Sequence, residues 1–215
     1  MTSNPNIRRW DVINHLIEKS GYETYLEVGS TGSLENPAPN LWHITAPTRV
    51  SVDPKGNPGF RMKSNDFFDM LPEHVKFDII FVDAEHTEAA VSCDITNSIA
   101  HLKPNGSIVV HDCNPPTARH STVEETEALY KKNKDGSGYY VWTGTVYMGF
   151  ISSRIKHPEY NFRCVDVDWG CGVIQRKSSD DKDFALTPPK SFDEFAEKRK
   201  EYLGLITWDE FISGL

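Results

Sequence analysis

The stretch Tyr25-Leu26-Glu27-Val28-Gly29-Ser30-Thr31-Gly32-Ser33 decides the fold. Its opening residues are mostly apolar or β-forming, which predicts a short buried strand over residues 24–28. The strand runs into Gly29, and Gly32 follows three residues later. A strand that ends in a glycine turn is how an open α/β sheet presents backbone N–H groups to a ligand. We therefore expect a ligand to lie against Gly29, Ser30 and Gly32, in space that a larger side chain at Gly29 would fill without disturbing the fold.

Glu27 interrupts this strand where a core strand would ordinarily carry an aliphatic side chain. The dinucleotide-binding turn has the pattern G-x-G-x-x-G, and its middle glycine is missing here, which disfavours a nicotinamide-dependent oxidoreductase. A carboxylate at the strand end suits a cationic ligand better than a pyrophosphate. The alternative is a tight turn beside a partly exposed Glu27, with no ligand.

Length and composition limit the classes of protein. The chain has 215 residues, 38% of them hydrophobic, which is enough for one domain with its own core. A net charge of −8 disfavours nucleic acids and anionic membranes as partners. The sequence has no apolar run of membrane-spanning length and no signal peptide at its start, so we expect a cytoplasmic protein. The four cysteines form no C-x-x-C pair, and we expect reduced thiols.

Further apolar runs predict the order of the elements. Strands are expected over residues 49–53, 60–63, 77–83 and 107–112, and an antiparallel hairpin over 162–175. Helices are expected over residues 8–20, 64–71, 87–101, 122–132, most of 139–155, 192–202 and 208–211. Loops or turns are expected over residues 36–47, 103–106 and 135–138. This order predicts a doubly wound, Rossmann-like α/β fold with a seven-stranded sheet, mostly parallel with one antiparallel strand, and helices on both faces.

We expect one domain over residues 1–215. Its core would span residues 22–177, after an N-terminal helix over 7–20 and before a C-terminal helical extension over 190–215.

Three further polar residues lie at the end of predicted strands or directly after them. Asp53 ends the second strand, at roughly the spacing at which an acid accepts hydrogen bonds from ribose hydroxyls in nucleotide-binding α/β folds. The alternative is an Asp-Pro turn residue. Asn65 and Asp66 open a helix, where Ser or Asn acts as the N-cap. Asp66 could also accept a hydrogen bond from an adenine amino group.

Polar side chains end two neighbouring strands of the predicted sheet. Asp83 and His86 follow one strand, and His111 and Asp112 end the next. The carboxyl ends of neighbouring parallel strands meet at one edge, so we expect these groups to converge. His86 is our preferred general base, because an unperturbed imidazole titrates near working pH, and we expect His111 to orient by hydrogen bonding. The alternative is that His86 only caps the following helix.

In this order, the stretches YLEVGSTG, VSVDP, SNDFF, FDIIFVDAEH, LKPNGSIVVHDCNPP, WTGTVY and CGVI resemble the class I S-adenosylmethionine-dependent methyltransferases. Within that class they are most similar to the small-molecule and sugar O-methyltransferase-like group. The resemblance covers residues 24–175. It implies an enzyme that moves a methyl group from S-adenosylmethionine to a hydroxyl of a small molecule, such as a sugar or polysaccharide precursor. The alternative is a non-catalytic protein that keeps the fold. A homo-oligomer is left open.

The resemblance also implies roles for individual positions. Glu27 would lie near the cofactor's ammonium, with Gly29, Ser30 and Gly32 around its methionine end. Asp53 would take the ribose, and Asn65 and Asp66 would lie near the adenine. The residues on the acceptor side would be Asp83, Glu85, His86, His111 and Asp112. Of these, Asp83 would also border the cofactor.

Metal-dependent catechol-type relatives place acids at the ends of the same two strands, and Asp83 and Asp112 match them. Cys113 departs from their pattern, because a thiol is a poor ligand for Mg²⁺. We therefore expect no metal site. The alternative is a divalent cation held by Asp83 and Asp112, with Glu85 or Asn114 as a third ligand.

Overall fold

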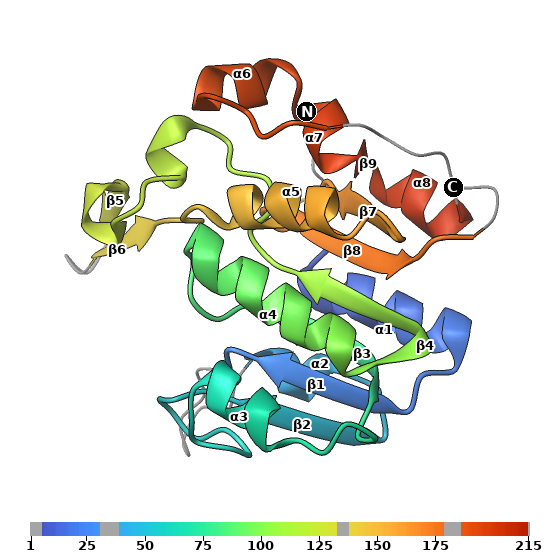
Figure 1. The fold of residues 1–215 in the computed structure, drawn as a ribbon. Coiled ribbons are helices and arrows are strands. Elements are labelled where there is room, and N and C mark those ends of the chain that lie inside the picture. The colour runs from blue at the N-terminus through green and yellow to red at the C-terminus, as the bar shows by residue number, and fades with distance from the viewer. Residues whose placement is uncertain (1–5, 31–38, 133–137, 179–185, 215) are drawn as a thin grey trace.

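The computed structural model describes residues 6–30, 39–132, 138–178 and 186–214. Within these residues a seven-stranded sheet has the order β2-β1-β3-β4-β8-β7-β9 (Figure 1). Its strands are β1 (Thr24–Val28), β2 (Thr48–Val52), β3 (Phe77–Val82), β4 (Leu102–Val110), β7 (Tyr160–Val165), β8 (Cys171–Arg176) and β9 (Leu205–Ile206). The helices are α1 (Arg9–Ser20), α2 (Pro39–His43), α3 (Ser64–Met70), α4 (Glu88–Ala100), α5 (Val146–Lys156), α6 (Phe192–Glu197), α7 (Arg199–Leu203) and α8 (Trp208–Ser213).

The sheet is mostly parallel, as predicted. The strands β2, β1, β3 and β4 pair in parallel, whereas β8 runs antiparallel to both β4 and β7. β9 pairs in parallel with β7, so β8 is the single reversed strand in the described part of the sheet. The carboxyl end of β7 therefore lies at the same edge as those of β3 and β4.

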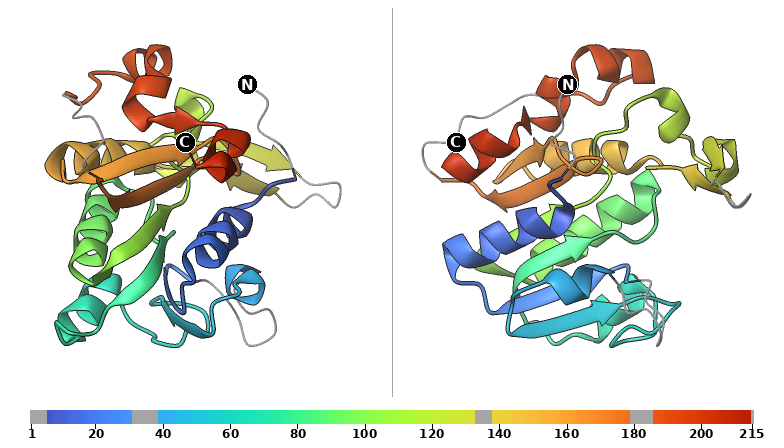
Figure 2. Two further views of the ribbon diagram at one scale, coloured as in Figure 1. Left: turned by 90° about the vertical axis from the view of Figure 1, so that its right-hand side faces the viewer. Right: turned by 180° about the vertical axis from the view of Figure 1, so that it is seen from behind.

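Helices cover both faces of the sheet (Figure 2). On one face α3, α4 and α5 pack over a cluster that includes Leu26, Ile80 and Ile108. On the other face α1 and α8 cover a second cluster that includes Tyr25 and Ile79. Neighbouring residues of β1 and β3 thus face opposite clusters, which explains why these strands are apolar on both sides. Gly21 ends α1 in the left-handed conformation with φ 66°, as expected of a C-cap.

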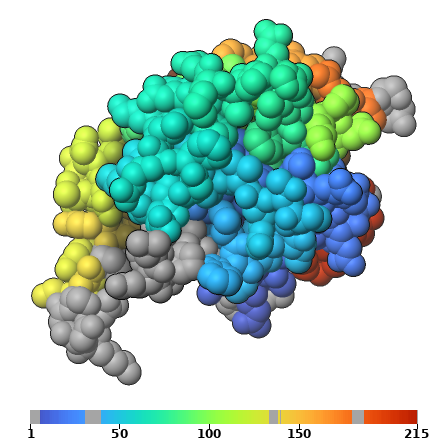
Figure 3. Space-filling view, turned by 90° about the horizontal axis from the view of Figure 1, so that it is seen from below, coloured from blue at the N-terminus to red at the C-terminus, as the bar shows by residue number. Residues whose placement is uncertain are grey.

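The segment after β4 differs from the prediction. The short helix Glu125–Glu127 precedes an antiparallel hairpin of β5 (Leu129–Lys132) and β6 (Gly138–Val141), so the predicted helix over 122–132 is wrong. The rings of Tyr130 and Tyr140 lie 5.0 Å apart across the hairpin, a cross-strand contact that favours pairing over a charged helix. The hairpin projects from one side of the molecule (yellow in Figure 3). The expected loop over 135–138 lies mostly outside the described residues.

Other predicted elements are corrected in detail. Residues 60–63 form only a single bridge, Val52 to Phe60, and β9 supplies a strand that the sequence did not predict. Residues 103–106 lie within β4, whose pairing with β3 shifts register there, and α2 lies within the expected loop 36–47. The helix predicted over most of 139–155 begins only at Val146. No helix in the described residues is long and apolar enough to cross a membrane.

Candidate active site

The carboxyl ends of four neighbouring strands form one row. Four valines lie side by side in register: Val52, Val28, Val82 and Val110. The next residue of each strand continues the row: Asp53, Gly29, Asp83 and His111. Backbone N–H groups of the last three donate to the preceding valine carbonyls of the adjacent strands at 2.9, 2.8 and 3.0 Å. Strand register therefore brings the predicted cofactor and acceptor residues to the same edge.

Gly29 lies where the end of β1 meets the end of β3. Its φ of 90° favours glycine, and a Cβ built on it would lie 2.1 Å from the carbonyl oxygen of Asp83 and 2.5 Å from Cα of Ala84. The glycine is therefore required by the approach of the β3 end. This corrects the expectation that a side chain at Gly29 would fill only ligand space and leave the fold intact.

Glu27 is 1% exposed, and its carboxyl is hydrogen-bonded by residues of β1 and of the glycine turn that follows. The Tyr25 hydroxyl donates to Oε2 of Glu27 at 2.6 Å, and Ser30, also buried, forms a second hydrogen bond with the carboxyl. Burial raises the pKa of Glu27 to about 7, although these hydrogen bonds oppose the rise. A buried acid poised between neutral and charged forms is not the partly exposed turn residue of the alternative interpretation.

The remaining predicted cofactor residues have different surroundings. Asp53 is buried, and its Oδ1 accepts a 2.6 Å hydrogen bond from the Lys55 N–H. Asp53 therefore stabilises the turn, as the Asp-Pro alternative expects, while its Oδ2 is left for a ligand. Asn65 is exposed, and its Oδ1 accepts from Cys93 Sγ and Asn97 Nδ2 of α4. Asp66 is exposed in the first turn of α3. Gly32 lies outside the described residues.

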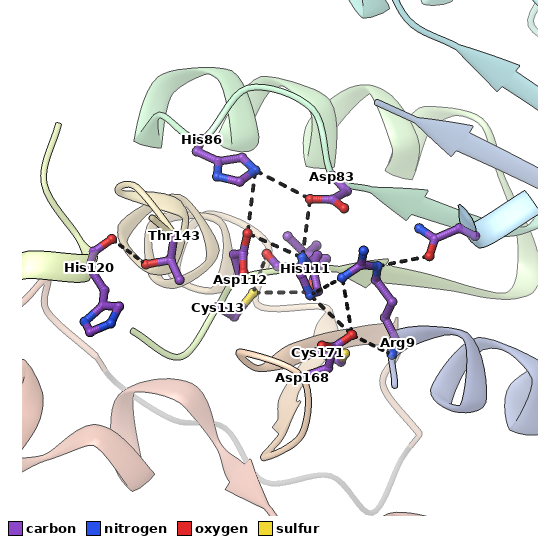
Figure 4. Close-up of polar contacts among 12 residues, drawn as sticks. Arg9, Asp83, His86, His111, Asp112, Cys113, His120, Thr143, Asp168 and Cys171 are labelled. Carbon is purple, nitrogen blue, oxygen red and sulfur yellow. Dashed lines mark hydrogen bonds and ion pairs between the residues drawn. The ribbon is translucent and has the colours of Figure 1, made fainter. Parts of the chain in front are cut away.

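The predicted acceptor residues do converge (Figure 4). His86 Nε2 lies 3.5 Å from Asp83 Oδ1 and 3.6 Å from Asp112 Oδ2. His111 Nδ1 lies 3.4 Å from the same two oxygens. Two imidazoles therefore face one pair of carboxylates from opposite sides. Glu85 is exposed, and its Oε1 accepts a hydrogen bond of 3.5 Å from the neighbouring Thr87 hydroxyl.

The charges of this cluster support one another. Burial alone would lower the pKa of each histidine, but the carboxylates of Asp83 and Asp112 raise the pKa of His86 and raise that of His111 more strongly. Burial alone would raise the pKa of Asp83, but the charge and hydrogen bonds of His111, with help from His86, hold it well below its usual range. Such mutual shifts mark candidate functional sites.

His86 does not cap α4. Thr87 is the N-cap, with its side chain accepting from the Ala90 N–H, which removes the capping alternative. The imidazole instead stacks on Trp142, with ring centroids 5.1 Å apart and planes 29° apart. Its Nδ1 is buried without a hydrogen-bond partner among the described residues. Trp142, predicted to be helical, lies in the segment before α5, and its indole N–H donates to the Thr122 carbonyl at 2.8 Å.

The sequence did not predict the contribution of Arg9 and Asp168. Arg9, the first residue of α1, places its Nη1 at 3.1 Å from His111 Nε2 and donates to Asp168 Oδ2 at 3.3 Å. The Asp168 side chain, 3% exposed, also accepts from the Arg9 backbone N–H at 3.0 Å. Asp168-Trp169-Gly170 lies in the turn of the β7–β8 hairpin, and the sequence predicts only the hairpin over residues 162–175. Arg9 and Asp168 have ordinary neighbours in the sequence and meet His111 only in the fold.

Strained backbone conformations are concentrated in the turn after β4 and in the turn between β7 and β8. Among the described residues, the non-glycine positions with positive φ are Asp112 at 60°, Asp168 at 45° and Trp169 at 69°. The two turns are joined by backbone hydrogen bonds, Cys113 N–H to Gly170 O at 3.0 Å and Asn114 N–H to Trp169 O at 2.8 Å. Strained conformations of this kind cluster at functional sites.

Three of these groups could hold a cation. Asp83, His86 and Asp112 each offer one ligand atom, and these atoms lie within 4.8 Å of one another. Of the two suggested third ligands, Asn114 is engaged elsewhere: its amide donates to Asp166 and accepts from Arg199. Glu85 is exposed. Cys113, which departs from the metal-dependent pattern, is buried in the apolar core. Asn114 is therefore removed as the third ligand of the metal alternative, while the expectation of a metal-free site remains a prediction.

A cavity elsewhere does not share these residues. It holds about 120 Å³ and is lined by residues of α1, α8 and the β7–β8 pair, including His15, Lys19 and Arg163. None of the predicted site residues lines it, so the polar cluster at the strand ends remains the candidate site.

Residues 26–113 match the family model described as a methyltransferase domain. The matched segment includes Glu27, Asp83 and Asp112. This part of the chain is similar to a methyltransferase domain, in agreement with the family resemblance predicted from the sequence. A search of curated protein sequences found no match.

Solved structures agree with this fold. The SAH-bound methyltransferase PaMTH1 from Podospora anserina superposes with a TM-score of 0.53 at 15% identity, over 79% of this chain and 78% of that chain. A putative O-methyltransferase from Klebsiella pneumoniae gives 0.49 at 12% identity, over 80% and 82%. The O-methyltransferase from Bacillus cereus, solved with SAH, gives 0.48 at 14% identity, over 81% and 84%. The likeness to the Podospora anserina structure, at 15% identity, shows the fold alone.

Proposed function

We propose that the protein transfers the methyl group of S-adenosylmethionine to a hydroxyl of a small molecule. The observation that carries this proposal is the direct contact between the glycine turn, which is predicted to bind the cofactor, and the polar cluster, which is predicted to bind the acceptor. Gly29, at the turn predicted to bind the cofactor, lies against the backbone of Asp83, which belongs to the polar cluster. A cofactor on the glycine turn would therefore present its reactive end to that cluster.

The residues on the cofactor side suit S-adenosylmethionine. A buried Glu27 with a pKa of about 7 would gain a charge partner from an ammonium group, which favours the ionised carboxyl. Asp53 keeps one carboxyl oxygen for ribose hydroxyls while the other holds its turn. The missing middle glycine of the dinucleotide pattern remains the reason to prefer this cofactor over a nicotinamide nucleotide. The SAH in the Podospora anserina structure supports the same choice.

The acceptor side suits removal of a proton from a hydroxyl. The cofactor supplies an electrophilic methyl group, and the protein must orient the acceptor oxygen and take up its proton. His86 is our candidate for this role, because its Nε2 lies 3.5 Å from Asp83 and 3.6 Å from Asp112 in the polar cluster beside the glycine turn. The proton from the hydroxyl would pass to the imidazole of His86.

A sugar-like acceptor is the substrate class we prefer. Trp142 stacks on His86 and is half-buried, so an apolar ring face borders the proposed base. We keep a cytoplasmic location as part of the proposal; all four cysteines are described and free, which agrees with reduced thiols.

Two measurements test the proposed function. Titration calorimetry with SAH and with NAD should give a saturable signal for SAH alone. Incubation with S-adenosylmethionine labelled in its methyl group, together with a panel of sugars and phenols, should then transfer label to a hydroxyl of at least one acceptor. Binding of NAD in preference to SAH would reject the cofactor. SAH binding without transfer to any acceptor would favour the non-catalytic alternative.

A further inference from the structure

The cavity between α1, α8 and the β7–β8 pair has an apolar floor and a polar mouth. Its volume is about 120 Å³. Leu16 of α1 and Val173 of β8 line it and are buried, whereas Lys19, Gln175 and Gly214 line it and are exposed. An apolar cavity of roughly 150 Å³ accepts benzene, so this cavity suits an apolar body of about four to six carbon atoms.

The charged side chains that line this cavity are basic. Lys19 and Arg163 are among the lining residues, and no aspartate or glutamate of the described residues lines the cavity with them. The Lys19 ammonium is at the mouth, 3.2 Å from the position that a Cβ would take on Gly214. The chain as a whole has a net charge of −8, so this lining is opposite in sign to the protein. A concave site with such a lining attracts anions.

His15 brings an unsatisfied polar atom to the same cavity. Its ring lines the cavity and contacts the rings of Trp208 and Phe211 of α8, with centroids 6.0 and 5.2 Å apart. Its Nε2 is buried and has no hydrogen-bond partner among the described residues. Burial and the nearby Lys19 lower the pKa of His15, so the ring is neutral at pH 7 and can donate a hydrogen bond from Nε2. A buried polar atom without a partner costs free energy, and a ligand oxygen within its reach would remove that cost.

The helix α8 covers the cavity but is not itself buried. None of its described residues is buried, and Phe211 is only partly buried against the core cluster on this face of the sheet. Phe211 and Ile206 of β9 both line the cavity. An apolar group beneath α8 would therefore add contacts to a helix that has few of its own, and such a helix opens easily without them.

We propose that this cavity binds a small carboxylate with a short apolar chain. The chain would lie against Leu16, Val173 and Phe211. The carboxylate would face Lys19 and accept a hydrogen bond from His15, which lies four residues before Lys19 on the same face of α1. The apolar floor disfavours inorganic phosphate, which has no apolar part to bury. The site goes beyond the proposed function and does not rest on it, because none of the predicted site residues lines the cavity.

Sodium butyrate is the probe, and 1-butanol, which has the same chain without the charge, is its matched control. Two-dimensional ¹H–¹⁵N NMR at constant ionic strength should show saturable shifts of α1 and α8 amides with butyrate, and hydrogen exchange in α8 should slow. Both 1-butanol and inorganic phosphate should bind at least about tenfold more weakly, because each lacks one half of the recognised chemistry. Shifts that do not saturate, or equal affinity for either control, would overturn the proposal.

Two variants test the residues. Lys19→Met, at an exposed position, should weaken butyrate binding by about 10–100-fold, the scale for a hydrogen bond to a charged group. His15→Phe keeps a ring beside α8 but removes Nε2, and should weaken binding by about fivefold or more. Lys132→Met is the matched control: it removes the same charge from the exposed hairpin, on the opposite side of the molecule from α8 (Figure 1), and should bind as the wild type does. Wild-type affinity in both Lys19→Met and His15→Phe, or an equal loss in Lys132→Met, would overturn the proposal.

Discussion

Gly29 and Asp83 are bound together by their backbones: the turn after β1 leaves no room for a Cβ between Gly29 and the Asp83 carbonyl, and the Asp83 N–H donates to Val28 beside it. The cofactor turn and the acceptor cluster therefore depend on one close approach. A change on either side of that approach should disturb both.

Gly29→Ala should destabilise the fold rather than only block a ligand. The new methyl group would meet the Asp83 backbone at 2.1 Å, and φ of 90° is strained for alanine, so we expect a loss on the order of 3 kcal/mol or more in the free energy of unfolding. Urea unfolding measures it. Gly21→Ala is the matched control: its φ is 66°, but nothing lies within 4 Å of its Cβ, so its loss should be clearly smaller. Equal losses would contradict the close-approach argument.

Cofactor binding should release a proton from Glu27. Burial raises its pKa to about 7, so the carboxyl is largely neutral at pH 6, and a cationic ammonium beside it favours the charged form. SAH affinity should therefore rise with pH from 5.5 toward 7, by up to about tenfold per pH unit, and level off above. Calorimetry at several pH values measures this slope. Glu27→Gln should bind more weakly and lose the slope; a wild-type affinity independent of pH would contradict the assignment.

Asp53→Asn should weaken SAH by about 1.5–3 kcal/mol, the scale for a hydrogen bond to a charged group. Asparagine keeps an oxygen for the Lys55 N–H, so the turn should survive while the charge that faces the ribose is lost. Calorimetry gives the affinity, and thermal unfolding without ligand shows that the turn is intact. An unchanged dissociation constant in the folded variant would reject the ribose role of Asp53.

The ends of the strands could be predicted from the sequence, because an apolar run that stops at a polar residue is visible in a few neighbouring residues. The apolar run Phe77–Val82 stops at Asp83, and the run before His111 stops in the same way, so the edge of the sheet and its polar residues could be placed without knowing any contact.

Long-range contacts were not predictable in this way. Arg9 reaches His111 across 102 residues, and nothing around Arg9 in the sequence distinguishes it from a surface arginine at a helix start. Trp142 was misplaced because apolar residues continue from β6 into α5, and that pattern hides the break at which Trp142 meets His86. The charged pattern over residues 122–132 predicts a helix, because the pairing of β5 with β6 is a tertiary effect that this pattern does not contain.

Chelation should leave both SAH binding and turnover intact. Glu27 and Asp53 on the cofactor side lie outside the candidate cation ligands, and the space between the Asp83 and Asp112 oxygens is already faced by Nδ1 of His111. Assays with EDTA, then with added Mg²⁺ or Mn²⁺, measure the effect. Activity that vanishes with EDTA and returns with Mg²⁺ would contradict this prediction, and Asp83, His86 and Asp112 would then be the first candidate ligands.

Replacement of His86 by alanine should lower kcat by about 10²–10⁴-fold, the usual contribution of a general base, with little change in SAH affinity. The base must be neutral to accept a proton, and Asp83 and Asp112 raise its pKa. The wild-type kcat should therefore rise with pH through a midpoint above 6.5, and His86→Ala should lose this midpoint. Raised pH should partly rescue the variant with a phenol, which can lose its proton unaided, and much less with a sugar hydroxyl. A parallel loss of kcat and of cofactor affinity would instead assign His86 a structural role, and Glu85 would be the next base to test.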